Sequence, residues 1–61
     1  MPVVTIQMAA GRTLEQKRRV VEEFTATLVS VMKVDPADVT ILVHELPRES
    51  IAKAGTLLSE R

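Results

Sequence analysis

Cysteine is absent from this chain of 61 residues, and histidine occurs only once, at His44. Stabilising disulfide bonds are therefore excluded, as is a structural zinc site built from cysteines and several histidines. A chain of this length buries only about 60% of the surface that its unfolded form exposes, so its core will be small. Because hydrophobic residues make up 46% of the chain, we expect self-association into a homo-oligomer to cover the remaining apolar surface.

An excess of charge of one sign is also absent, since eight basic and eight acidic side chains balance to a formal net charge of zero. The chain therefore lacks the broad positive potential that would attract nucleic acids or anionic membranes. No run approaches the roughly 18 apolar residues of a membrane-spanning helix. The N-terminus also lacks the basic and apolar regions of a signal peptide. We therefore expect no nucleic-acid partner, no membrane association and a cytoplasmic location.

Repeats, linkers and low-complexity segments are likewise missing, which predicts a single domain over residues 1–61. The segment from Val3 to Met8 is rich in β-branched residues and predicts a strand that is at least half buried. Thr13 is followed three residues later by Gln16, which is the capping-box signature of a helix start. We therefore expect a helix from near Leu14.

Apolar side chains at three- and four-residue steps predict that this helix is amphipathic and continues to about Lys33. Its apolar stripe is widened by Val20, and the aliphatic stem of Lys17 contributes to it. Met8 and Met32 fit core positions. The stripe consists of Leu14, Lys17, Val20, Val21, Phe24, Leu28, Val31 and Met32.

The Asp35-Pro36 pair ends the helix because a residue before proline disfavours the α conformation. Val39 to Leu46 follows and is apolar on both faces over its middle, which is typical of a strand covered above and below. Two strands joined by a helix predict a right-handed βαβ unit with parallel pairing. One helix covers one face, so we expect another copy of the chain to cover the other face of Ile41, Leu42 and Val43.

The tail after Pro47 contains Ala54-Gly55 followed by Thr56-Leu57-Leu58. This order favours a hairpin that adds a short strand to a neighbouring chain, although Glu49 to Lys53 also fits a turn of helix. The predicted fold class is α+β, with one βαβ unit and a C-terminal hairpin.

Pro2 is the first candidate for chemistry. Removal of Met1 would leave the proline nitrogen as a secondary amine at the start of the first strand, whereas retained Met1 makes this nitrogen an amide. An ordinary α-amino group titrates near 7.7 to 8.0, and an apolar or cationic setting lowers the pKa of an amine. Such a group moves protons at neutral pH. The alternative is that Pro2 only begins an edge strand, where its missing N–H costs nothing.

Arg12 is the second candidate because it lies between Gly11 and the expected helix start. Its guanidinium can bind a carboxylate beside the positive end of the helix dipole; the alternative is an exposed arginine with a weak surface ion pair. About ten residues of extended chain at ~3.3 Å each separate it from Pro2. A site that contains both would therefore form between subunits, or by a return of the chain.

The remaining ionisable residues give weaker signals. His44 has no second histidine or cysteine to form a metal site, so a strand histidine at a surface or interface explains it. Arg48, Glu49 and Lys53 fit surface charges. No serine–histidine–acid set and no phosphate-binding loop is present.

The order of these features resembles the 4-oxalocrotonate tautomerase family over the full chain. The resemblance lies in Met-Pro before a short strand, Gly11-Arg12-Thr13 with Glu15-Gln16-Lys17 at the start of a long helix, and a second strand that reaches Glu45. It implies that Pro2 is the catalytic amino-terminal proline and that Arg12 binds a substrate carboxylate. It further implies a homohexamer, a trimer of dimers in which two subunits share a four-stranded sheet.

This resemblance implies a cofactor-independent tautomerase, without a metal, that moves a proton in 2-hydroxydienoate or 2-oxoacid substrates. Two positions depart from the family pattern. A second substrate-binding arginine aligns with Thr40, which donates a hydrogen bond but supplies no charge, and an aromatic pocket residue aligns with Ile51. Arg48 or Lys53 could replace the missing charge. The departures leave two alternatives open: a hydratase, dehalogenase or decarboxylase of the wider superfamily, and a non-catalytic oligomeric module.

Overall fold

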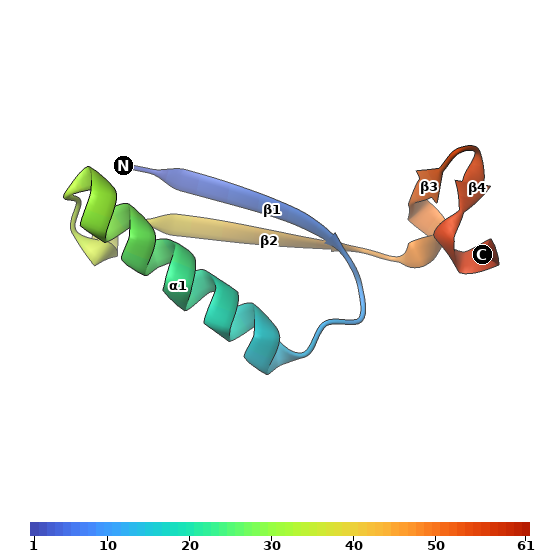
Figure 1. The fold of residues 1–61 in the computed structure, drawn as a ribbon, viewed down its shortest axis with the longest axis horizontal. Helices are drawn as coiled ribbons and strands as arrows, with labels where there is room; N and C mark the ends of the chain where they lie inside the picture. The colour runs from blue at the N-terminus through green and yellow to red at the C-terminus, as the bar shows by residue number, and fades with distance from the viewer.

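The computed structural model describes residues 1–61 and contains one βαβ unit followed by a small hairpin (Figure 1). Strands β1 (Val3–Ala9) and β2 (Thr40–Leu46) pair in parallel, and α1 (Leu14–Met32) connects them. Two short strands, β3 (Ala52–Lys53) and β4 (Thr56–Leu57), pair antiparallel in the tail. The α+β fold and the parallel βαβ unit predicted from the sequence are therefore confirmed.

Both ends of α1 are fixed by local hydrogen bonds. At the start, Thr13 Oγ1 accepts from the Gln16 backbone N–H at 3.1 Å and Gln16 Oε1 accepts from the Thr13 backbone N–H at 3.0 Å. These two bonds are the predicted capping box. At the end, Lys33 adopts a left-handed conformation, with φ 57°, and its N–H donates to the Val29 carbonyl. A 3₁₀ turn over Pro36–Asp38 then leads into β2.

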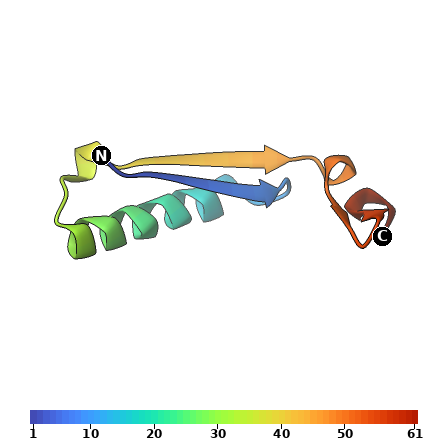
Figure 2. The same cartoon turned by 90° about the horizontal axis from the view of Figure 1, so that it is seen from above.

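The helix covers one face of the two-stranded sheet and leaves the opposite face open (Figure 2). In the parallel register, Val4 and Ile6 pair with Ile41 and Val43, and all four are half-buried on the helix side. Leu42 lies on the open face and is 45% exposed. We expected another copy to cover Ile41, Leu42 and Val43, but only the Leu42 side chain lies on the open face. Side chains alternate between the two faces of a strand, so Ile41 and Val43 face α1.

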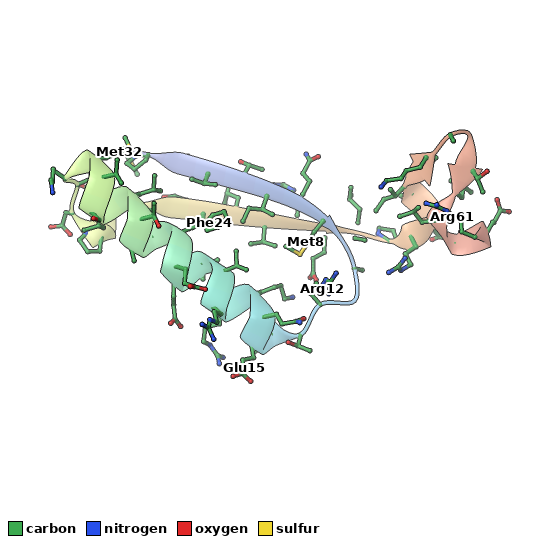
Figure 3. The ribbon with its side chains drawn as sticks, viewed as in Figure 1. Met8, Arg12, Glu15, Phe24, Met32 and Arg61 are labelled. Atoms are coloured by element: carbon green, nitrogen blue, oxygen red, sulfur yellow. The ribbon has the colours of Figure 1, made fainter.

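The predicted apolar stripe of α1 is confirmed at Lys17, Val20, Val21 and Leu28, which are half-buried, but not at Phe24, which is 46% exposed. Leu14, Val31 and Met32 remain 67%, 73% and 53% exposed, so the prediction of Met32 as a core residue is wrong within one chain. A helix of 19 residues spans about 28 Å, whereas a strand of seven residues spans about 23 Å. The helix is also inclined to the strands, so its first turn, near Glu15, diverges from the sheet, and its last turn, near Met32, reaches past the start of β1 (Figures 1 and 3).

No residue of the chain is buried, and the molecule is elongated, with extents of 44 × 22 × 14 Å. Its radius of gyration is 14.7 Å, compared with about 10.5 Å for a compact domain of this length. Its accessible surface is 4801 Å², compared with roughly 3,900 Å² for a folded monomer of the same mass. The single chain thus exposes about 900 Å² more than a typical folded monomer of its mass would.

The C-terminal hairpin extends beyond the ends of β1 and β2, away from α1 (Figures 1 and 2). Its turn consists of Ala54 and Gly55, both with positive φ (52° and 81°), as the tight turn between paired strands requires. A 3₁₀ turn over Arg48–Ser50 precedes it, so the tail contains the predicted hairpin and also a helical turn. No helix in the chain has the length and apolar character that crossing a membrane requires.

Candidate active site

Pro2 lies at the entry to β1 and is half-buried. Its carbonyl accepts a hydrogen bond from the Thr40 backbone N–H at 3.1 Å, which extends the β1–β2 ladder by one residue. This bond fixes Pro2 beside Thr40 at the first residue of β2. While Met1 is attached, the Pro2 nitrogen is an amide and is not basic. Met1 is 91% exposed and its side chain contributes little to the packing.

Arg12 lies at the other end of β1, in the connection to α1 (Figure 3). It follows Gly11, whose φ of 122° suits glycine, and it precedes the helix N-cap Thr13. The seven residues of β1 separate Arg12 from Pro2 by about 23 Å. As the sequence predicted, the two candidate residues do not meet within one subunit.

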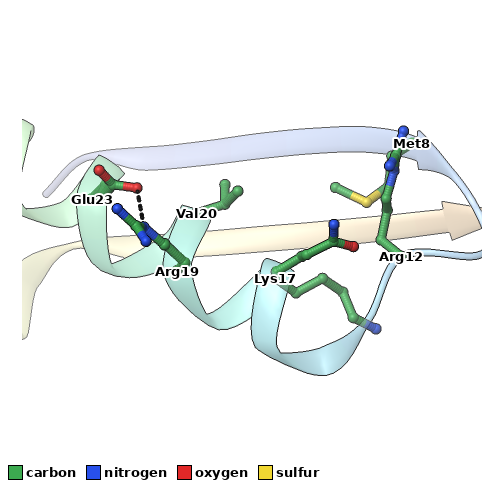
Figure 4. A pocket seen from close by; sticks show the side chains of 7 residues that line it. Met8, Arg12, Lys17, Arg19, Val20 and Glu23 are labelled. Carbon is green, nitrogen blue, oxygen red and sulfur yellow. Dashed lines mark hydrogen bonds and ion pairs between the residues drawn. The ribbon is translucent and has the colours of Figure 1, made fainter.

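An open hollow of about 430 Å³ lies between the first half of α1 and the end of β1 (Figure 4). Arg12 lies at one end of this hollow, and the exposed Arg19–Glu23 ion pair of α1, 3.2 Å, lies at the other. Arg12 itself has no carboxylate within 4.0 Å, since the two ion pairs of the chain involve Lys17 and Arg19. The hollow is lined by Met8, Arg12, Gln16, Lys17, Arg19, Val20 and Glu23.

The other two substrate-binding candidates lie at opposite ends of the sheet. Thr40 is half-buried beside Pro2. Ile51 follows the 3₁₀ turn of the tail, and with Leu46 and Leu58 it lines a second hollow of about 320 Å³ near the end of β1. Arg48 and Lys53 belong to the same tail. Within one subunit neither can replace a missing charge beside Pro2, because the length of the sheet intervenes.

One polar contact was not predicted from the sequence. Lys17 Nζ lies 2.9 Å from Glu45 Oε2 and joins the first turn of α1 to the end of β2. The sequence contains a signal for it, because Lys17 occupies the apolar stripe and an alternating strand places Glu45 on the same side as Val43. By contrast, His44 pairs with Gln7 in the register and is exposed on the open face, as predicted for a surface or interface residue.

The parallel βαβ unit with a terminal hairpin is the fold of a small tautomerase. A family model described as tautomerase enzyme matches residues 2–61. The 2-hydroxymuconate tautomerase of Comamonas testosteroni is 37% identical over 60 residues, which are 98% of this chain and 95% of the relative. The chain therefore belongs to the tautomerase family and is a 4-oxalocrotonate tautomerase-like isomerase.

Solved structures agree with this assignment. A structure from work on the 4-oxalocrotonate tautomerase isozymes of Methylibium petroleiphilum is 36% identical, with a TM-score of 0.87, and covers 95% of this chain and 91% of that chain. A heterohexameric 4-oxalocrotonate tautomerase from Chloroflexus aurantiacus is 27% identical, with a TM-score of 0.88, and covers 98% and 97%. The hairpin is included in these matches, because they span nearly the whole chain.

Proposed function

We propose that this protein is a cofactor-independent tautomerase whose base and acid is the Pro2 amine, formed by removal of Met1. In the reaction, the neutral amine takes the proton from the enol hydroxyl of a 2-hydroxydienoate or from the enol form of a 2-oxoacid. The enol oxygen becomes a carbonyl, the double bond shifts along the carbon chain, and the protonated amine returns the proton to a carbon atom. Atoms and charge balance without a metal or a redox cofactor.

The observation that most supports this proposal is the position of Pro2 in a chain of this family. Pro2 begins the first strand, its carbonyl is bonded to Thr40, and it is half-buried. A neighbouring apolar surface would lower the pKa of the freed amine because burial disfavours the charged form. A fraction of the amine would then be neutral near pH 7 and able to accept a proton. The tautomerase family match begins at Pro2 and continues to residue 61, in agreement with one tautomerase domain.

Arg12 has the role of binding the substrate carboxylate in this proposal. Its guanidinium is exposed and has no acidic partner, and the adjacent helix N-terminus favours an anion. Because about 23 Å of strand separates it from Pro2, the Arg12 that serves a given Pro2 comes from a neighbouring subunit. Thr40 would donate a hydrogen bond to substrate beside Pro2, and Ile51 would line the apolar part of the pocket.

The same proposal requires an oligomer, for which we propose a homohexamer built as a trimer of dimers, each dimer sharing a four-stranded sheet. Two features support it. The sheet of one subunit has two strands, an open face and no buried residue, and tautomerases are small oligomeric enzymes, one relative being a heterohexamer. An antiparallel or parallel contact between two such sheets would give four strands.

Intact mass and activity, measured on one untagged sample, test the proposal. We expect a mass that lacks methionine, together with ketonisation of 2-hydroxymuconate or phenylenolpyruvate. Pro2→Ala should retain partial activity because it leaves a primary amine. A sample that keeps Met1 and still has full activity would refute the amine mechanism. A processed sample that hydrates or decarboxylates these acids without ketonising them would instead identify another reaction of the superfamily.

A further inference from the structure

The segment that contains Arg12 is held at both ends by the carboxyl end of β2. At its start, the Ala10 N–H donates to the Leu46 carbonyl at 2.8 Å. Just beyond its other end, Lys17 Nζ donates to Glu45 Oε2 at 2.9 Å. Since Glu45 and Leu46 are consecutive residues, both contacts attach the Arg12 segment to one point on the sheet.

The Lys17–Glu45 contact is linked to Arg12 through the backbone of the first turn of α1. The Lys17 backbone N–H donates to the carbonyl of Thr13 at 3.1 Å, and Thr13 directly follows Arg12. The Lys17–Glu45 bond is also the one side-chain hydrogen bond between α1 and the sheet; the other four are local. A Cβ added at Gly11, on the other side of Arg12, would contact nothing. The Lys17–Glu45 pair and the Ala10–Leu46 bond are therefore the two hydrogen bonds that attach the Arg12 segment to the carboxyl end of β2.

Charge in the hollow supports a second role for Glu45. Lys17 lines this hollow together with Arg12, and an unpaired ammonium group there would attract the same carboxylate. Glu45 neutralises Lys17 at 2.9 Å, as Glu23 neutralises Arg19. Arg12 therefore remains the one cation of the hollow without an acidic partner, and an incoming carboxylate binds at a single defined point.

We infer that Lys17 and Glu45 are positioning residues, which hold the Arg12 segment in the orientation that binds the substrate carboxylate. The inference rests on the proposed function, in which Arg12 binds this group. The Lys17 and Glu45 side chains are 25% and 34% exposed, and ion pairs near the surface contribute little to global stability. Loss of the pair therefore changes substrate binding more than folding.

Steady-state kinetics with 2-hydroxymuconate test this role, on the full chain without Met1 and at one subunit concentration. We expect Lys17→Met and Glu45→Gln each to raise KM about three- to tenfold, a loss of about 0.7 to 1.4 kcal/mol in binding. The kcat of both should stay within about twofold, because neither residue contacts the reacting atoms. The charge reversal K17E/E45K restores an ion pair and should return KM to within about twofold of the unmodified protein.

Arg18 supplies the matched control. It lies next to Lys17 on α1, is exposed, forms no ion pair and does not line the hollow, so Arg18→Met removes one positive charge from α1 without detaching the helix from the sheet and should leave KM unchanged. A rise in KM for Lys17→Met with a fall for Glu45→Gln would overturn the inference, because a freed Lys17 would then bind substrate itself. If Lys17→Met fails to fold, as judged by circular dichroism, Glu45→Gln and the reversal decide the question.

Arg12→Ala separates failure of this inference from failure of the proposed function. If Arg12→Ala lowers kcat/KM while all Lys17 and Glu45 variants keep the original KM, the positioning role is wrong and the proposed function stands. If Arg12→Ala itself changes nothing, the proposed role of Arg12 fails first. If Arg12→Ala and the single Lys17 and Glu45 variants all raise KM, and the charge reversal restores it, the results support both the proposed function and the positioning role.

Discussion

Replacement of Leu42 by glutamate should dissociate the proposed oligomer, because Leu42 is an apolar side chain on the face that one chain leaves open. Leu42 is 45% exposed in the isolated chain, and Val3 and Leu46 on the same face are 57% and 38% exposed. Contact with another copy would remove this surface from water. A glutamate would place a charge without a partner in the contact, where desolvation disfavours it strongly.

The expected loss of association free energy follows from the exposed fraction of the Leu42 side chain. Full burial of a leucine contributes about 1.5 to 3 kcal/mol, so the exposed 45% corresponds to about 0.7 to 1.4 kcal/mol for each Leu42. A symmetric contact contains two copies, which gives about 1.4 to 2.8 kcal/mol, or a ten- to hundredfold weaker dissociation constant from lost apolar contact alone. The excess surface of about 900 Å² per subunit is close to one partner's share of a standard interface, about 800 Å².

Sedimentation velocity and thermal unfolding, measured from about 1 to 100 μM subunit, would test this expectation. The midpoint of unfolding should rise with concentration for the unmodified protein, because association stabilises the folded state by mass action. Leu42→Glu should sediment as a smaller species with a lower midpoint, and the volume-conserving Leu42→Met should behave like the original. A folded monomer at 1 μM, with a midpoint independent of concentration, would refute the reasoning.

Three further substitutions have defined outcomes. Thr13→Ala removes the hydroxyl of the capping box and should lower the free energy of unfolding by about 1 kcal/mol, measured as a fall of roughly 4 to 8 °C in Tm at fixed subunit concentration. Ala54→Gly should stabilise the hairpin, because the left-handed conformation of Ala54, φ 52°, costs about 1 to 2 kcal/mol. This cost exceeds the stability lost through the greater freedom of glycine in the unfolded chain, about 0.4 to 1 kcal/mol. Hydrogen exchange of the Leu58 amide, which is bonded to the Ile51 carbonyl at 2.8 Å, should therefore slow. Thr40→Arg places a cation beside Pro2 and should raise kcat/KM for the dicarboxylate 2-hydroxymuconate relative to the monocarboxylate phenylenolpyruvate, by about tenfold or more if one charged hydrogen bond of about 1.5 to 3 kcal/mol forms. An unchanged ratio would show that residue 40 does not contact the second carboxylate.

Local signals in the sequence were sufficient to predict most of the backbone. The Thr13–Gln16 capping box, the Asp35-Pro36 stop and the Ala54-Gly55 turn each act through neighbours within a few residues. Their structural consequences therefore do not depend on the rest of the molecule. The strand pairing followed from the order of elements, since two strands joined by one helix pair in parallel.

The side-chain arrangement was harder to predict because it depends on the relative lengths and angles of the elements. Periodicity alone placed Leu14 and Met32 in the same stripe as Leu28, yet both lie on terminal turns of α1 that do not pack on the sheet (Figure 1), and both stay exposed. The Lys17–Glu45 pair joins residues 28 positions apart, and its existence depends on the register of β1 with β2. Sequence spacing contains no direct record of that register, so neither the contact nor its relation to Arg12 was predicted.

Catalytic activity depends on the association equilibrium if Pro2 and Arg12 act together, because the two residues then come from different subunits. The parallel register places Pro2 beside the first residue of β2, whereas the Arg12 segment is bonded to the last residue of the same strand. No rotation of side chains closes a gap of about 23 Å, so a complete site needs a second subunit. Dilution, or Leu42→Glu, should therefore reduce the activity per subunit in parallel with the oligomer fraction. The Lys17 and Glu45 variants should instead raise KM while the oligomer fraction stays constant.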